Sequence, residues 1–253
     1  MIPKKIHYCW LSGDEMPKNL KKCMQSWKKY LPDYELVLWD TNKFDINSVP
    51  WVKEAFENKK YAFAADYIRC YALYTEGGIY LDTDVEVLKS FDPLLNLPYF
   101  IGKENGNHDL WEAATMGSEP GNTIFLDMMK YYENRHFLQN NQFDLKEMPI
   151  ILKEMGEKRA KIKDIKNYKE FSDDDSLFQI LPIDYFSPKS WGTGKISKTK
   201  NTFSIHHFES SWVPQDRRKL IMRNRLIHRL IPSKKLIRGL IIVKHLLNGT
   251  RPL

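Results

Sequence analysis

Residues 62–87 read AFAADYIRCYALYTEGGIYLDTDVEV, and this stretch decides the fold of the chain. The apolar residues over 61–75 recur at helical spacing, and Gly77-Gly78 predicts the end of that helix. Residues 79–81 predict a short buried strand, and Asp82-Thr83-Asp84 follows at its carboxyl end. In open α/β sheets ligands bind at that edge, so the triplet is the first candidate for a functional site.

The flanking sequence extends this pattern into an α/β domain. Residues 2–9 and 34–39 predict strands, and 18–30 predict an amphipathic helix between them, as at the start of a parallel sheet. Further helices are expected at 51–60 and near 122–135, and strands at 99–103, 178–183 and 203–208. A polar stretch, 139–176, lies among them. We therefore expect one catalytic domain over 1–216.

The composition of the 253 residues, 42% of them hydrophobic, suffices for one core. Cys9, Cys23 and Cys70 lack metal-ligand spacing, and so sparse a set argues for a reducing compartment. The start shows no secretory pattern, and no apolar run reaches the ~20 residues that span a bilayer. These observations predict a cytoplasmic protein.

The net charge of +7 comes from the end of the chain. Eleven of the 39 Lys and Arg lie in 217–253, which has no acid, so the remainder carries 28 basic and 32 acidic residues. The net charge of −4 that remains over residues 1–216 gives no support for nucleic-acid binding. The tail alternates apolar pairs with cations and is broken by Pro232, which predicts amphipathic helices on an anionic membrane surface. The alternative is a terminal helix packed on the body.

Asp82 and Asp84 have the spacing of residues that point the same way on a strand. Two carboxylates at a strand end can share a hard cation, which neutralises a diphosphate as it departs. Glu86 adds a third acid nearby. The alternative is a pair of surface acids in a turn.

Two further groups carry candidate chemistry. Asp66 and Arg69 share one face of the apolar helix, either as a simple ion pair or facing a ligand. Later, the run HHFESSW at 206–212 offers a histidine, either His206 or His207, to complete metal coordination at Asp84. Glu112 and the three acids at 173–175 are candidates for lining the acceptor side of a site, but for both we prefer the interpretation that they are solvated acids in loops.

Three segments together resemble glycosyltransferase family 32. They are IPKKIHYCWLSG (2–13), the block at 62–87 and HHFESSW (206–212). That family includes bacterial capsular-polysaccharide transferases and yeast mannosyltransferases, and it is related to the clostridial glucosylating toxins. The resemblance extends over 1–90 and 203–213, and the middle matches only loosely.

The resemblance implies a GT-A, Rossmann-like fold and a retaining transferase that uses Mn²⁺ or Mg²⁺. The donor is expected to be a UDP-hexose and the acceptor a lipid-linked surface or capsular polysaccharide. A bacterial enzyme bound to the inner face of the membrane follows as the expected setting.

The resemblance also implies a role for each matching residue. Trp10 would stack on the base, unless it is a core residue, and Tyr80 would lie by the nucleotide. Asp66, Arg69 and Asp82 would act on the donor sugar, with Asp84 as main metal ligand. Ser211 and Trp212 would hold the β-phosphate, and their spacing slightly favours His207 as the late ligand. Ser210 stands where the family has a small residue or glycine.

Two other functions compete with this interpretation. In a phosphohydrolase of the HAD type an apolar strand also ends in a D-x-D motif, and here Asp82 would be the nucleophile and Asp84 the acid. That motif normally opens a chain, whereas here a β-α-β unit precedes it. The other alternative is a non-catalytic, membrane-bound scaffold.

Overall fold

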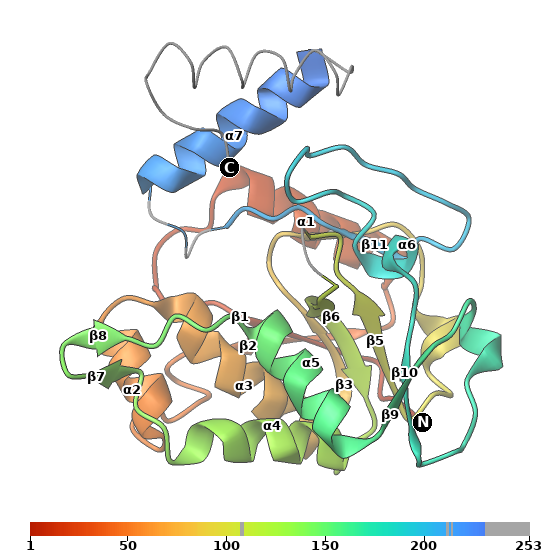
Figure 1. Cartoon of the computed structure of the whole chain (residues 1–253), viewed down its shortest axis with the longest axis horizontal. Helices are drawn as coiled ribbons and strands as arrows, with labels where there is room; N and C mark the ends of the chain where they lie inside the picture. Colours follow the sequence, from red (N-terminus) through yellow and green to blue (C-terminus); the bar gives the residue numbers. More distant parts are fainter. Residues whose placement is uncertain (107–108, 211–212, 214, 231–253) are drawn as a thin grey trace.

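The computed structural model describes residues 1–106, 109–210, 213 and 215–230. Its centre is a five-stranded sheet in the order β2-β1-β3-β6-β5 (Figure 1). The strands are β1 (Lys5–Cys9), β2 (Glu35–Trp39), β3 (Gly78–Leu81), β5 (Tyr99–Lys103) and β6 (Trp111–Ser118). β2, β1 and β3 are parallel, whereas β6 runs antiparallel to both of its neighbours. The predicted α/β class is confirmed, with a mixed sheet.

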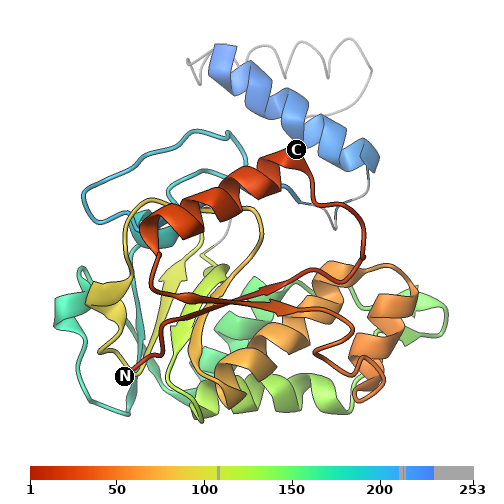
Figure 2. The same ribbon diagram turned by 180° about the vertical axis from the view of Figure 1, so that it is seen from behind.

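Helices pack on both faces of the sheet, which separates two hydrophobic cores. α2 (Pro50–Glu57), α3 (Tyr61–Thr75), α4 (Thr123–Glu133) and α5 (Met148–Arg159) contribute to one core, and α1 (Lys18–Tyr30) to the other. The alternation of β3 shows this division, because Tyr80 packs in the first core while Ile79 and Leu81 pack in the second. α4 and α7 (Gln215–Leu230) lie at opposite ends of the molecule (Figures 1 and 2).

Smaller elements complete the fold. β4 (Val85–Val87) pairs with β11 (Ser204–His206), β9 (Lys161–Asp164) with β10 (Leu177–Ile180), and β7 (Leu138–Gln139) with β8 (Gln142–Phe143). The short helix α6 (Ile183–Phe186) follows β10, and single 3-10 turns occupy Asp92–Leu94 and Tyr168–Glu170.

The sequence interpretation succeeded best in the first hundred residues. The helices expected at 18–30 and 61–75 have those bounds, whereas the helix expected at 51–60 ends at Glu57. β6 was not predicted, and α5 and β9 lie in the stretch described only as polar. β6 is buried on both faces and rich in small residues, so it lacks the alternation that marks a half-exposed strand.

A buried histidine fixes β3 beside β1. Nε2 of His7 lies 2.6 Å from the carbonyl oxygen of Gly77, and Nδ1 accepts a hydrogen bond of 3.0 Å from Nε1 of Trp39. Gly78 has a φ of 105°, and a Cβ there would lie 2.9 Å from the carbonyl oxygen of Lys5. The two glycines therefore let the chain pass close to β1 before it enters the strand that carries the Asp82 turn.

The basic tail is described only as far as α7. Residues 231–253, which include the predicted break at Pro232 and the second helix, lie outside the described part. Among the described residues, no helix is long and apolar enough to cross a membrane.

Candidate functional site

A cavity of about 430 Å³ lies at the carboxyl edge of β1 and β3. Its walls come from the loop after β1, from α3, from the segment that follows β11 and from α7. Seven acids line the cavity: Asp66, Asp82, Asp84, Glu104, Glu112, Glu147 and Glu209. Arg69 and Arg218 are the arginines among the lining residues. So acidic a cavity favours the binding of cations.

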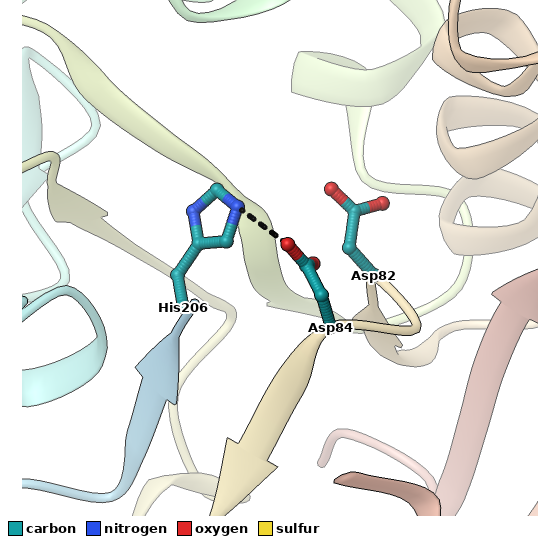
Figure 3. Close-up of side chains that lie close together, drawn as sticks. All are labelled: Asp82, Asp84 and His206. Atoms are coloured by element: carbon teal, nitrogen blue, oxygen red, sulfur yellow. Dashed lines mark ion pairs between the residues drawn. The ribbon is translucent and has the colours of Figure 1, made fainter. Parts of the chain in front are cut away.

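Asp82 and Asp84 come together in a turn rather than along a strand. β3 ends at Leu81, and the backbone N–H of Val85 donates a hydrogen bond of 3.0 Å to the carbonyl oxygen of Asp82. The argument from strand alternation is therefore wrong, although the two side chains do converge. Asp82, Asp84 and His206 each place a ligand atom within 4.8 Å of the others (Figure 3).

β11 brings His206 to the Asp82 turn. The strand pairs antiparallel with β4, which places His206 opposite Val85, and Nε2 of His206 lies 3.7 Å from Oδ2 of Asp84. The side chain of His207 lies elsewhere, with Nε2 2.9 Å from Oε2 of Glu86. The geometry therefore groups His206 with the two aspartates, and it does not follow the spacing argument that favoured His207.

Glu112 contacts the ring nitrogen of His206 that does not face Asp84. Its side chain is fully buried, accepts a 2.8 Å hydrogen bond from the backbone N–H of Ala114, and lies 3.1 Å from Nδ1 of His206. Burial disfavours the imidazolium, but the carboxylates of Glu112 and Asp84 outweigh it and raise the pKa of His206 to about 10. The interpretation of Glu112 as a solvated loop acid is wrong.

The structure also places the acids at 173–175 and an acid that the sequence did not indicate. Asp173, Asp174 and Asp175 are exposed, in agreement with the preferred interpretation as solvated acids. Residues 173–175 line a separate groove beside α4, so they do not face this cavity. Glu104, which the sequence analysis did not single out, lies with Glu112 and His206 in a second group of potential ligands. Burial raises the pKa of Glu104 to about 8, and the Glu112 carboxylate adds to that shift. Glu104 follows an apolar strand and precedes a loop, and this position in the sequence could have identified it as a candidate.

Arg69 joins α3 to the Asp82 turn. Its Nη2 lies 3.2 Å from Oδ1 of Asp66 and 3.4 Å from Oδ1 of Asp82, and Nη1 donates to the carbonyl oxygen of Ala113 at 2.9 Å. The guanidinium also stacks over Tyr80, whose hydroxyl donates a hydrogen bond of 2.9 Å to Asp82. The predicted intrahelical pair exists, and it extends into the site.

Burial dominates the ionisation of both of these carboxyl groups. It raises the pKa of Asp66 to about 7, against the opposing effect of the Arg69 cation. The pKa of Asp82 is also raised by burial, again opposed by Arg69, while the neighbouring Asp84 adds to the shift. A cation bound between Asp82 and Asp84 would favour the ionised forms of these two side chains.

Trp10 lines the cavity in the loop after β1. It is partly exposed, and its Nε1 donates a hydrogen bond of 2.8 Å to the carbonyl oxygen of Asp14. The ring is therefore placed at the site rather than in a core. Ser211 and Trp212 lie outside the described residues, so their expected contacts with a phosphate stay predictions.

The chemistry of the ligand set fits a hard divalent cation. Two carboxylates and one imidazole lie within reach of a single ion, and oxygen-rich sets of this kind suit Mn²⁺ and Mg²⁺. The backbone N–H of Glu209 donates a hydrogen bond of 2.8 Å to Oδ2 of Asp84, which fixes that carboxylate.

Part of this site lies in a region that matches a known protein family. Residues 17–101 match the family described as the glycosyltransferase sugar-binding region containing a DXD motif. These residues belong to that family. Asp82 and Asp84 lie within the matched region, which supports the predicted resemblance and disfavours the phosphohydrolase alternative.

Curated relatives of this DXD region come from several organisms. A mannosyl phosphorylinositol ceramide synthase of Saccharomyces cerevisiae is 33% identical over 54% of this chain and 37% of its own length. An inositol phosphoceramide mannosyltransferase of Schizosaccharomyces pombe is 36% identical over 54% of this chain and 40% of its own. The chain thus spans about two fifths of the length of these relatives.

Among solved structures, the PaToxG glycosyltransferase aligns over 51% of this chain and 59% of its own, with a TM-score of 0.41 and 21% sequence identity.

Proposed function

We propose that this protein is a retaining, metal-dependent glycosyltransferase that moves a hexose from a nucleotide sugar, a UDP-hexose, to a glycan acceptor. The observation that carries the proposal is the group formed by Asp82, Asp84 and His206 inside the acidic cavity, within and beside the DXD region. A bound Mn²⁺ or Mg²⁺ supplies Lewis acidity that neutralises the charge building on the departing diphosphate.

His206 and Asp84 are the direct ligands in this proposal. The Glu112 carboxylate accepts a hydrogen bond from Nδ1–H of His206, which leaves Nε2 to face the cation. The hydrogen bond from Glu209 N–H holds Asp84 in a single orientation. The two ligands are thereby fixed before the donor arrives, as electrostatic preorganisation requires.

Arg69 acts as a positioning residue. Its guanidinium already contacts Asp66, Asp82 and the Ala113 carbonyl, so it holds both carboxylates in place rather than reaching a phosphate. In this role it keeps Asp66 and Asp82 ready to accept hydrogen bonds from hydroxyl groups of the donor sugar. Trp10 supplies a face for the base, and Tyr80 fixes Asp82.

The retaining step needs no protein nucleophile in this proposal. The acceptor hydroxyl attacks from the side that the diphosphate leaves, and the departing phosphate takes its proton. The C1–O bond to the diphosphate breaks as the new glycosidic bond forms, so the only products are the glycoside and the nucleoside diphosphate. Asp66 and Asp82 stabilise the positive charge that develops on the sugar.

A lipid-bearing acceptor is supported by two observations. The names of the first two relatives include phosphoinositol ceramides and mannosyl transfer. α7 also exposes Leu220, Met222 and Leu226 among its cations, which suits contact with an anionic membrane. We therefore propose an acceptor anchored in the membrane, such as a lipid-linked surface or capsular polysaccharide, with the enzyme on the inner face.

The proposed function is tested by incubating the protein with Mn²⁺ and a panel of UDP- and GDP-linked hexoses, mannose included. We expect release of a nucleoside diphosphate that disappears in Asp84→Ala and persists in Asp173→Ala, an acid of the separate groove. Phosphate release from phosphomonoesters would instead favour the phosphohydrolase. Inactivity in both assays would favour the scaffold.

A further inference from the structure

The balance of charge in the cavity poses a problem for an anionic donor. Seven acids line it, and a diphosphate brings further negative charge. Arg69 is committed to Asp66, Asp82 and a backbone carbonyl, so it cannot also serve the diphosphate. The other arginine among the described lining residues is Arg218, on α7.

The orientation of α7 is fixed by a neighbouring arginine. Nε of Arg225 donates a hydrogen bond of 2.9 Å to the carbonyl oxygen of Trp191, and Nη1 one of 3.3 Å to that of Phe208. The ring of Phe208 in turn packs against that of His206, with 4.0 Å between the ring centroids and 33° between the ring planes. α7 is therefore connected directly to the segment that carries the candidate metal ligand.

The spacing of Arg218 and Arg225 places both on one face of α7. Seven residues correspond to about two helical turns. The exposure of the helix agrees, because Arg218, Ile221 and Arg225 are partly buried while Arg217 and Arg223 are exposed. The hydrogen bonds of Arg225 thus present Arg218 to the cavity. Among the described residues, Arg218 has no hydrogen bond or ion pair of its own.

We propose that Arg218 binds the diphosphate of the nucleotide-sugar donor, together with the metal. This inference rests on the proposed function and extends its donor site to α7. A guanidinium presents several N–H donors in a plane and bridges phosphate oxygens in a way that a point charge does not. Arg218 adds a positive charge to a cavity lined by seven acidic residues.

The same residue links donor binding to the proposed membrane surface. Leu220 lies on the face of α7 opposite Arg218, and Leu226 lies about a quarter turn from Arg218 and Arg225; both leucines are exposed. A helix that contacts lipid with one face and diphosphate with the other is stabilised in place by both ligands. Donor affinity then depends on the same helix that the membrane orders.

The test measures binding of UDP and UMP by calorimetry in the presence of Mn²⁺, using the full chain. Arg218→Ala is expected to weaken UDP binding about tenfold or more, the loss typical of one charge-assisted hydrogen bond. UMP, which lacks the second phosphate, should lose less. Arg218→Lys should fall between Arg218→Ala and the wild type.

Arg217→Ala and Arg223→Ala are the matched controls, because each removes one exposed arginine from the same helix. Both should bind UDP as the wild type does, and all variants should melt at similar temperatures. Equal UDP affinity in Arg218→Ala and Arg217→Ala would overturn the inference alone. If the wild type binds none of UDP, GDP, ADP and CDP with Mn²⁺, the proposed function and the inference both fail.

Discussion

Glu112 and His206 form a buried carboxylate–imidazole pair, with Oε1 of Glu112 3.1 Å from Nδ1 of His206. The glutamate has no exposed surface, and its contact leaves the other ring nitrogen facing Asp84 at 3.7 Å. Pairs of this kind orient histidine ligands and increase their basicity. The pair therefore makes His206 a prepared ligand rather than an isolated surface residue.

Glu112→Gln should weaken Mn²⁺ binding by roughly tenfold to a hundredfold, the usual cost of losing a partner of a ligating histidine. The amide can still contact Nδ1 but carries no charge to support it. Titration of Mn²⁺ by electron paramagnetic resonance measures the change. Glu57→Gln, which removes an exposed acid at the end of α2, should bind Mn²⁺ as the wild type does. Unchanged affinity in Glu112→Gln would contradict the positioning role.

Arg69→Lys should lower both stability and turnover. A lysine keeps the charge, but it cannot contact Asp66, Asp82 and the Ala113 carbonyl together, so a buried acceptor loses its donor. The free energy of unfolding in urea should fall by about 2 kcal/mol. Arg159→Lys, at an ion pair with Asp127 that is one-third exposed, is the control and should change it little. If Arg69→Lys kept the stability and turnover of the wild type, the contacts of Arg69 with Asp66 and Asp82 would be dispensable.

His7 should make the fold sensitive to acid. Because Nδ1 accepts from Trp39, the proton lies on Nε2 and is donated to Gly77, so the ring is neutral. Burial lowers the pKa of His7. The unfolded chain then binds more protons than the folded one below about pH 6.5, so this contribution is complete at higher pH and is lost as the pH falls.

Unfolding in urea at several pH values, with an NMR titration of the histidines, measures this effect. Wild-type stability should fall between pH 7.5 and pH 5 more than that of His7→Gln, which has no group that titrates there. A His7 ring that protonates above pH 6.5 in the folded protein would refute the prediction.

The exposed leucines of α7 should contribute to membrane binding. Leu220→Glu combined with Leu226→Glu places acids on the apolar, cationic surface and should strongly reduce co-sedimentation with phosphatidylglycerol vesicles. Ile196→Glu is the control, because it alters an exposed apolar residue outside α7, and it should not reduce co-sedimentation. Deletion of 217–253 should abolish binding. Equal sedimentation with and without that segment would exclude it as the membrane contact.

The sequence predicted the first half of the fold well because its signals there are local. The apolar helix at 61–75, the glycine pair and the Asp82 turn follow one another within one short stretch. β6 was not predicted because a strand that is buried on both faces shows no alternation of apolar and polar residues. Glu112 was considered as a candidate, but without β6 its contact with His206 could not be predicted.

The choice between the two histidines illustrates a second limit. His206 is the last residue of β11 and His207 follows it, with the two rings on different partners, so the register of β11 against β4 decides which ring reaches Asp84. Spacing to a downstream motif carries no information about that register. Arg218 was likewise hidden, because only the docking of α7 through Arg225 brings it to the cavity.

The measurement that tests the central claim most directly is the position of Mn²⁺ in crystals grown with Mn²⁺ and UDP. Anomalous scattering locates the ion independently of any activity. The account predicts one strong peak within bonding distance of Asp84 and His206, beside Asp82 and in contact with the diphosphate. UDP bound in the cavity with no manganese at these residues would contradict it.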